Sequence, residues 1–340
     1  MRRSILPFLG VTAGLAAVAV SRRRAVDDHD SFYEGSGERT GVLEYGPVRF
    51  SLPLTGHRTE QVISVHAVAF EPARALLPSD QLHPVRLPDG RALLAVSAAR
   101  YVEATADGMD PHELPYGESM IIVFVTPRPA RPVVPVLRGM LPGRGMPPFG
   151  GFLIHAGMSD RASRDMGRAL GYPAFTADFA FEDDVAERRV RVSDDGRDIF
   201  RLRVASKGRY SVDRRPMLVY NVCGEELVET ICVCSGIVQQ ALGRGTGILE
   251  LGDHPVADQL RALEVSPRPI LSRSYVNLRI MIPPQRVVGP ARPFPGYAGS
   301  DRDFGEYTIR YPDGSLIDLN APKRARARAM TPNEPVLAHA

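Results

Sequence analysis

The clearest residue for chemistry in this chain is a carboxylate at the head of an apolar run. Glu118 follows Leu114-Pro115-Tyr116-Gly117 and precedes Ser119, and the run continues to Thr126. A carboxyl group buried away from cations has a raised pKa and can serve as a general acid or base. A carboxylate where a strand begins can equally be exposed to solvent, and the pattern leaves both alternatives open.

Amine chemistry has only two candidates in the sequence. Of the 42 lysines and arginines, only Lys207 and Lys323 are lysines. A lysine that attacks a carbonyl group must be neutral, which requires burial or a neighbouring cation. Lys207 lies in the polar, turn-like stretch Ser206-Lys207-Gly208-Arg209, and Lys323 lies near the basic C-terminus. We therefore expect both to be ordinary solvent-exposed lysines.

Other familiar patterns are weak or missing. The eight histidines show no spacing typical of metal ligands, so we predict no metal site, and no cofactor motif is present. The stretch Gly243-Arg244-Gly245-Thr246-Gly247 lacks the lysine of a phosphate-binding loop, and we interpret it as a turn. Cys232 and Cys234 are two apart in an apolar run, hence on one face of a strand, and with Cys223 we expect buried thiols.

The composition is that of a globular chain. The 340 residues carry a formal net charge of +3, with both signs spread along the sequence, which argues against nucleic acid as the main partner. The 31 glycines and 30 prolines favour turns and short strands over long helices.

The two ends differ from the rest of the chain. Residues 1–24 hold an uncharged run, 4–20, between arginine clusters, which predicts a short membrane anchor; a cleaved secretory signal and a misassigned start are the alternatives. This predicts a membrane-anchored or exported protein, on a side that the arginines do not indicate. Residues 321–340 form a basic tail, either disordered or in contact with acidic lipid headgroups. Residues 25–320 are left as the folded domain.

Alternating apolar residues predict a strand-rich domain. A hairpin over 189–204, with one arginine-lined face, turns at Asp194-Asp195-Gly196. Further strands are predicted at 62–70, 92–101, 119–126, 152–155, 217–223, 227–234, 248–251 and 276–282. Short helices are predicted at 71–77, at 160–170 after a Ser159 cap, and at 254–263. Short connections favour antiparallel pairing, so we predict an α+β fold around a curved antiparallel sheet or β-barrel.

One long segment, 127–151, is too rich in proline and glycine for a helix or a central strand. A loop of this length is either solvated or functional. It could act as a lid or bind a partner, and the sequence leaves its role open.

Several short segments, taken in order, resemble the acetoacetate decarboxylase family. They are Ala75-Leu76-Leu77-Pro78 with Pro84-Val85-Arg86-Leu87-Pro88, Tyr101 with Leu114 to Ser119, Gly167-Arg168-Ala169-Leu170-Gly171-Tyr172-Pro173, and Leu249 to Pro255 with Arg261-Ala262-Leu263. The resemblance covers about residues 48–288. It implies a curved sheet with a few short helices around an internal cavity for a small oxo acid, and it is compatible with a homo-oligomer.

The resemblance also implies a nucleophile that this chain lacks. Members of the family form a Schiff base between a lysine and a β-keto acid, and their Tyr-Pro pair is followed by two lysines. Here Tyr172-Pro173 is followed by Ala174 and Phe175, neither of which can form an imine. We therefore expect no Schiff-base decarboxylation.

The resemblance assigns site residues to the positions that match. Glu118 is the catalytic candidate, and the candidates for substrate binding are Tyr116, Tyr172, Phe175 and Arg58. Arg58 would hold a substrate carboxylate only if a bulge or a gap intervenes, because an ungapped count ends at Thr59 on the opposite face of the strand. Arg100 is either one of many outward arginines or a replacement carboxylate clamp.

Three functions follow from these residues. The preferred hypothesis is a family member with a degenerate site that binds a small oxo or carboxylic acid in an internal pocket, or acts on it through Glu118 without an imine. One alternative is a carboxy-lyase with a relocated lysine, Lys207. The other is a non-catalytic scaffold or interaction protein at the membrane, with a collapsed pocket.

Overall fold

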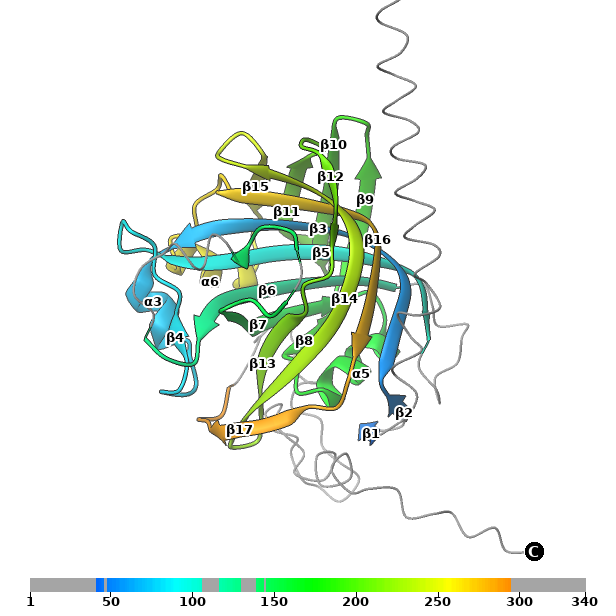
Figure 1. Ribbon diagram of the computed structural model, residues 1–340, viewed down its shortest axis with the longest axis vertical. Coiled ribbons are helices and arrows are strands. Elements are labelled where there is room, and N and C mark those ends of the chain that lie inside the picture. Colours follow the sequence, from blue (N-terminus) through cyan, green and yellow to red (C-terminus); the bar gives the residue numbers. More distant parts are fainter. Residues whose placement is uncertain (1–40, 46–47, 106–115, 130–138, 144, 295–340) are drawn as a thin grey trace, which may run out of the picture. The chain divides into compact units, whose positions relative to one another are not determined.

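Strands dominate the computed structural model, which describes residues 41–45, 48–105, 116–129, 139–143 and 145–294 (Figure 1). The strands are β1 (Gly41–Tyr45), β2 (Val48–Leu52), β3 (Leu54–Val68), β4 (His83–Pro84), β5 (Ala92–Thr105), β6 (Tyr116–Thr126), β7 (Gly150–Met158), β8 (Ala174–Thr176), β9 (Asp178–Asp183), β10 (Glu187–Asp194), β11 (Arg197–Ala205), β12 (Tyr210–Asp213), β13 (Met217–Cys223), β14 (Glu226–Leu242), β15 (Gly247–Leu251), β16 (Leu271–Ile282) and β17 (Arg286–Pro290). The helices are α3 (Phe70–Ala75), α5 (Arg161–Ala169) and α6 (Pro255–Ala262). Each predicted strand and helix overlaps one of these elements.

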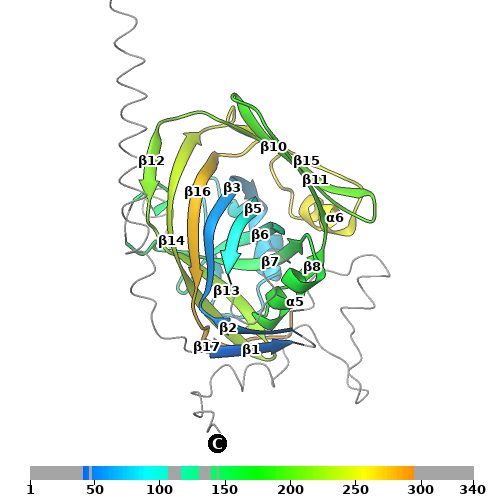
Figure 2. The same cartoon turned by 90° about the vertical axis from the view of Figure 1, so that its right-hand side faces the viewer.

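The largest sheet is curved, and seven of its strands pair in a closed ring (Figure 2). The order around the ring is β6, β5, β3, β16, β14, β13 and β7, and β7 pairs again with β6. Strands β4, β8, β12 and β17 pair at its margins. The predicted α+β fold with a curved sheet is confirmed.

Two parallel pairings depart from the predicted antiparallel sheet. Strand β7 runs parallel to β13 and to β8. Between β7 and β8 the chain passes through α5, and a helical crossover returns the chain to the same end of the sheet. The prediction of short antiparallel connections was wrong at this point because the helix lies between the two strands.

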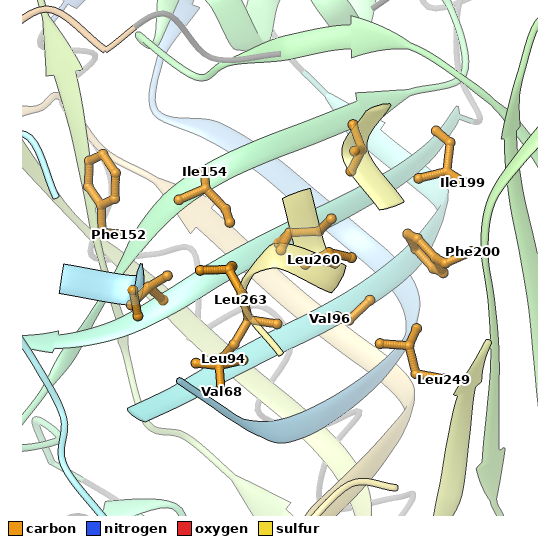
Figure 3. Packing of buried hydrophobic residues seen from close by; sticks show 14 of the residues in the cluster. Val68, Leu94, Val96, Phe152, Ile154, Ile199, Phe200, Leu249, Leu260 and Leu263 are labelled. Carbon is orange, nitrogen blue, oxygen red and sulfur yellow. The ribbon is translucent and has the colours of Figure 1, made fainter. Parts of the chain in front are cut away.

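A second sheet of four strands, in the order β15, β11, β10 and β9, contains the predicted hairpin. Leu260 and Leu263 of the α6 region pack with Phe200 and Leu249 of this sheet and with Leu94 on the ring (Figure 3). All of these side chains are buried. The second sheet and α6 therefore cover an outer face of the ring.

Because the outer face is covered, ring strands are buried on both sides. On β5, Leu94 and Val96 belong to the outer core, whereas Ala95 and Ser97 line a cavity on the inner side. This alternation is the strand period of two residues. It assigns a side to each residue of β5 from Ala92 to Tyr101, before the pairing with β3 becomes irregular.

The helix ends correct one sequence prediction. The cap of α5 is Asp160, whose side chain accepts a hydrogen bond from the Ser163 amide at 2.8 Å, rather than Ser159. The Ser159 hydroxyl instead accepts a hydrogen bond from the Gly117 amide at 2.8 Å. Helix α6 is capped by the His254 ring and has Pro255 in its first turn.

Two predicted segments lie outside the described residues: 1–24, with its apolar run 4–20, and the basic tail 321–340. No helix in the described part of the chain is both long enough and apolar enough to cross a membrane.

Candidate functional site

A cavity of about 150 Å³ lies inside the strand ring, and its walls include residues from all seven ring strands. Most of the lining side chains are apolar. The others are Gln61, Ser97, Tyr101, Glu118, Tyr172, Asp213, Arg215, Cys232, Cys234, Arg273 and Tyr275. A cavity of about this volume in another protein holds benzene. The size therefore suits a compact organic molecule.

Strand alternation turns Glu118 into this cavity. Glu118, Met120, Ile122 and Phe124 line the cavity, whereas Ile121 and Val123 belong to the outer core. Glu118 is only 5% exposed. The sequence left burial or exposure of Glu118 open, and the structure shows burial.

Gly117, the residue before Glu118, is fixed by hydrogen bonds to Ser159 and by packing against Phe179. Gly117 and Ser159 are joined by two hydrogen bonds, from the Gly117 amide to the Ser159 hydroxyl at 2.8 Å and from the Ser159 amide to the Gly117 carbonyl at 2.9 Å. A Cβ atom on Gly117 would lie 2.8 Å from Cγ of Phe179. Glycine at this position lets Phe179 pack against the backbone, which fixes the start of β6.

Burial raises the pKa of Glu118 to about 8, and a hydrogen bond with Tyr101 partly opposes this shift. Removing a carboxylate from water disfavours its charged form, whereas a donated hydrogen bond favours it. At pH 7 most Glu118 side chains therefore carry a proton. A neutral carboxylic acid in an apolar cavity can both donate and accept hydrogen bonds.

Two other buried tyrosines surround the carboxyl group. Tyr172 lines the cavity, as predicted for a substrate-binding residue. Tyr116 does not line the cavity; its ring stacks on Tyr101, which does. Burial raises the pKa of Tyr101, Tyr116 and Tyr172 well above the usual value, so their hydroxyls stay protonated.

Arg58 is not at the cavity. Its side chain is exposed, whereas Thr59 is fully buried. Bulges do interrupt the β3–β5 pairing on both sides of Arg58, yet they leave Arg58 outside. Thr59 has the same parity as Gln61 and Ile63, which line the cavity.

Phe175 also lies elsewhere. It packs in the outer core, edge-to-face with the ring of His155 at a centroid distance of 6.4 Å. Its neighbour Ala174 is buried in the inner core, because successive residues of β8 point to opposite faces. Among the five predicted site residues, the structure thus brings Glu118 and Tyr172 to the cavity.

No lysine of the described residues replaces the missing pair. The Ala174 methyl group is fully buried, and a Cβ atom on Gly167 would lie only 3.1 Å from it. Lys207 is exposed in the turn between β11 and β12 and does not line the cavity. Lys323 lies outside the described residues.

Arg100 is an outward arginine. It forms ion pairs with Glu60 and, at 3.2 Å, with Asp183. Its guanidinium also lies over the ring of Phe181, 5.6 Å from the centroid. These partners hold it on the outer side of the ring, so it is no clamp for a ligand in the cavity.

A second polar group in the cavity was missed by the sequence analysis. It consists of Asp213, Arg215, Arg273 and Tyr275. The predicted strand began at residue 276, whereas β16 begins at Leu271, so Arg273 was left in a connection. The alternation of Leu271, Arg273 and Tyr275 was the signal that could have shown a shared face.

Metal binding has no obvious site in the ranges that the structure describes. No group of three or more histidine, cysteine, aspartate or glutamate side chains gathers there in a way that could hold an ion. Cys232 and Cys234 are buried, and burial raises the pKa of Cys232 to about 12. Neither thiol is therefore an activated nucleophile.

The comparison with protein families agrees with this fold. The family described as "Acetoacetate decarboxylase (ADC)" matches residues 44–289, most of the chain. The chain belongs to the acetoacetate decarboxylase family. Among curated proteins, no significant match was found.

Solved structures of acetoacetate decarboxylase share the fold. One, described as "Structural Studies of Acetoacetate Decarboxylase", has 16% sequence identity and a TM-score of 0.51, and the match covers 73% of this chain and 91% of that one. The acetoacetate decarboxylase from Legionella pneumophila has 18% identity and a TM-score of 0.51, with 70% and 88% covered. At this identity the likeness concerns the acetoacetate decarboxylase fold alone.

Proposed function

We propose that this chain binds a small oxo acid in the ring cavity and that protonated Glu118 donates a hydrogen bond to the oxo oxygen of the ligand. Any reaction at this site then runs through Glu118 as an acid rather than through a lysine imine. One observation carries the proposal: Glu118 is buried at the cavity wall, where burial raises its pKa to about 8. Membership of the acetoacetate decarboxylase family supports the class of ligand.

The surroundings of Glu118 suit this role. A hydrogen bond from a neutral acid to a carbonyl oxygen is strengthened in an apolar site that excludes water. The same proton can be passed to a ligand oxygen atom that gains negative charge, which is general-acid catalysis. Tyr101, hydrogen-bonded to Glu118, keeps the carboxyl group in a fixed orientation.

The distribution of lysines argues against an imine. Ala174 and Phe175 occupy the positions of the family's lysine pair, and Lys207 is solvent-exposed away from the cavity. A lysine that forms an imine needs a desolvated site or a neighbouring cation, which an exposed turn does not provide. The open cavity also argues against the scaffold hypothesis, which required a collapsed pocket.

Calorimetric titration with 3-methyl-2-oxobutanoate between pH 6 and pH 9 tests the proposal. The affinity of the wild-type chain should fall above pH 8, because Glu118 loses the proton that it donates. Glu118→Gln keeps a neutral donor, so its affinity should not change over this range. Glu118→Leu should bind about tenfold more weakly or worse, since it lacks a donor. Glu182→Gln, at an exposed position of β9, is the matched control.

Imine formation is tested in parallel with sodium borohydride. The wild-type chain is incubated with the same oxo acid and borohydride, and its intact mass is measured. We expect no covalent adduct. An adduct on Lys207, or binding that Glu118→Leu leaves unchanged, would overturn the proposal.

A further inference from the structure

The second polar group of the cavity contains a buried hydrogen-bond donor with nothing to donate to. Nη2 of Arg273 is shielded from solvent and has no hydrogen-bond partner among the described residues. Buried donors are almost always paired in folded proteins, so such an atom calls for an explanation. We infer that Arg273, assisted by Arg215, binds the carboxylate of the ligand. This inference rests on the proposed function, in which the oxo group of the same ligand binds Glu118.

Arg273 is held in a fixed orientation by its neighbours. Its Nε donates to Oε1 of Gln240 at 2.6 Å, and its Nη1 lies 3.4 Å from Oδ2 of Asp213 and 3.3 Å from the hydroxyl of Tyr275. Tyr275 in turn donates to Asp213 at 2.8 Å. These contacts use Nε and Nη1 and leave Nη2 available. The guanidinium is thus preorganised to receive an anion.

The charged side chains around the cavity favour a ligand with a single negative charge. The described lining residues include two carboxyl groups, those of Glu118 and Asp213, and two guanidinium groups, those of Arg215 and Arg273. Glu118 is mostly neutral at pH 7, because burial raises its pKa to about 8. The two arginines then exceed Asp213 by one positive charge. A ligand with one carboxylate would balance this charge, whereas a phosphorylated or doubly charged ligand would leave negative charge without a partner.

Arg215 adds a second donor beside this group. Its Nε is buried and lacks a hydrogen-bond partner among the described residues, and its backbone amide lies 3.3 Å from Oδ1 of Asp213. Guanidinium groups bind carboxylates through parallel N–H···O bonds, which lysine cannot form. Two arginines near one carboxylate side chain therefore make a specific anion site.

The strand register shows how this site relates to Glu118. Arg273 pairs with Ile63, Ile63 with Ser97, and Ser97 with Met120. Glu118 is the preceding cavity-facing residue of β6, so it lies one row from Arg273 and three strands away. Three strand spacings amount to roughly 14 Å along the curved wall. Both side chains point inward from this curved wall, so the gap between their polar ends is smaller than the distance along the wall.

The wall between the two polar ends is mostly apolar. Ile63 and Met120 line the cavity there, together with the polar side chains of Gln61 and Ser97. A ligand that satisfies both ends has one carboxylate, an oxo group and a branched or cyclic hydrocarbon body between or beside them. The chemical class is therefore an apolar oxo monocarboxylic acid, with its carboxylate at Arg273 and its oxo oxygen toward Glu118.

Paired ligands separate this inference from the proposed function. We would measure by calorimetry the binding of 3-methyl-2-oxobutanoate and of its neutral primary amide to the wild-type chain, Arg273→Gln and Arg215→Gln. Arg273→Gln should weaken binding of the acid at least tenfold and leave binding of the amide unchanged. Arg215→Gln should have a smaller effect in the same direction. Arg203→Gln, at an exposed position of β11, is the control.

Each outcome has a definite meaning. If Arg273→Gln affects acid and amide equally, or neither, while Glu118→Leu weakens both, the carboxylate site is wrong and the proposed function stands. If neither compound binds the wild-type chain, both are wrong. Should Arg273→Gln fail to fold, Arg273→Lys keeps the charge but cannot form the two-pronged contact, and it should still weaken binding of the acid several-fold and spare the amide.

Discussion

Tyr101 and Tyr116 face each other across β5 and β6, and their rings stack with centroids 4.4 Å apart and planes 7° from parallel. The stack fixes the Tyr101 ring at the cavity wall, and Tyr101 is hydrogen-bonded to Glu118. Tyr116, predicted as a substrate-binding residue, thus acts on the cavity through its neighbour. The stacked tyrosines therefore connect the packing between β5 and β6 with the protonation of Glu118.

Tyr101→Phe should raise the pKa of Glu118 above about 8, because the hydrogen bond from Tyr101 stabilises the charged carboxylate. The measurement is a pH titration of the glutamate carboxyl ¹³C resonance, assigned with Glu118→Gln. Tyr116→Phe keeps the stacked ring and should change the pKa of Glu118 much less. An equal shift in both variants would contradict the assigned hydrogen bond.

Glu118 should make the fold less stable as the pH rises. An unfolded glutamate titrates near 4.5 and the folded Glu118 at about 8, so between these values the unfolded state loses its proton first. Stability therefore falls from pH 4.5 to pH 8 and is constant above. Relative to wild type, Glu118→Gln should gain about 3 kcal/mol between pH 5 and pH 7.5. Urea unfolding at both pH values measures this difference, and no change with pH would refute it.

His66 should make the fold acid-sensitive. Burial lowers its pKa to about 4 from 6.5, and its two ring nitrogens lie 2.7 Å from the Ser266 carbonyl and the Ser64 hydroxyl. The folded pKa lies below the unfolded one, so the contribution is complete above pH 6.5 and is lost toward pH 4.

The free energy of unfolding should fall less in acid for His66→Gln than for the wild-type chain, by up to about 3 kcal/mol. Urea unfolding at pH 4.5 and pH 7 measures this difference. Burial also lowers the pKa of His155 to about 4, so His155 should still destabilise the His66→Gln variant in acid. His83→Gln, at the margin of the ring, serves as the control and should behave as wild type. The prediction is wrong if His66→Gln and His83→Gln lose the same free energy of unfolding between pH 7 and pH 4.5.

Gly117→Ala should destabilise the start of β6. The added Cβ atom would lie 2.8 Å from Cγ and 2.9 Å from Cδ2 of Phe179, so the ring or the strand must move. Overpacking of this kind costs about 1–3 kcal/mol. Gly245→Ala adds the same methyl group where no atom lies within 4 Å, and it should change stability by less than about 0.5 kcal/mol. Thermal unfolding compares the two, and equal melting temperatures would disprove the clash.

The sequence predicted the ring strands well where apolar residues alternate. The strand predicted at 92–101 is β5, and the face of each of its residues follows from the period of two. The family resemblance named Glu118 and Tyr172 as site candidates, and both line the cavity, while their roles there stay predictions. These successes rest on regular patterns of at least seven residues or on ordered motifs.

Short or irregular segments hid the rest of the site. Strand β8 has only three residues, so the opposite faces of Ala174 and Phe175 were not predictable from periodicity. Met140 and Phe149, in the segment interpreted as a loop, are buried and line the cavity, because isolated apolar residues among prolines and glycines show no period. Arg273 was missed because polar neighbours concealed the start of β16.

The proposed function requires Glu118 to be a neutral acid that binds an oxo acid in the cavity. The most direct test is the ¹³C titration of Glu118 with and without saturating 3-methyl-2-oxobutanoate. We expect the pKa of Glu118 to be near 8 in the free chain and higher in the complex, because the ligand binds the protonated form and brings a negative charge. A pKa near 4.5 that the oxo acid does not change would contradict it.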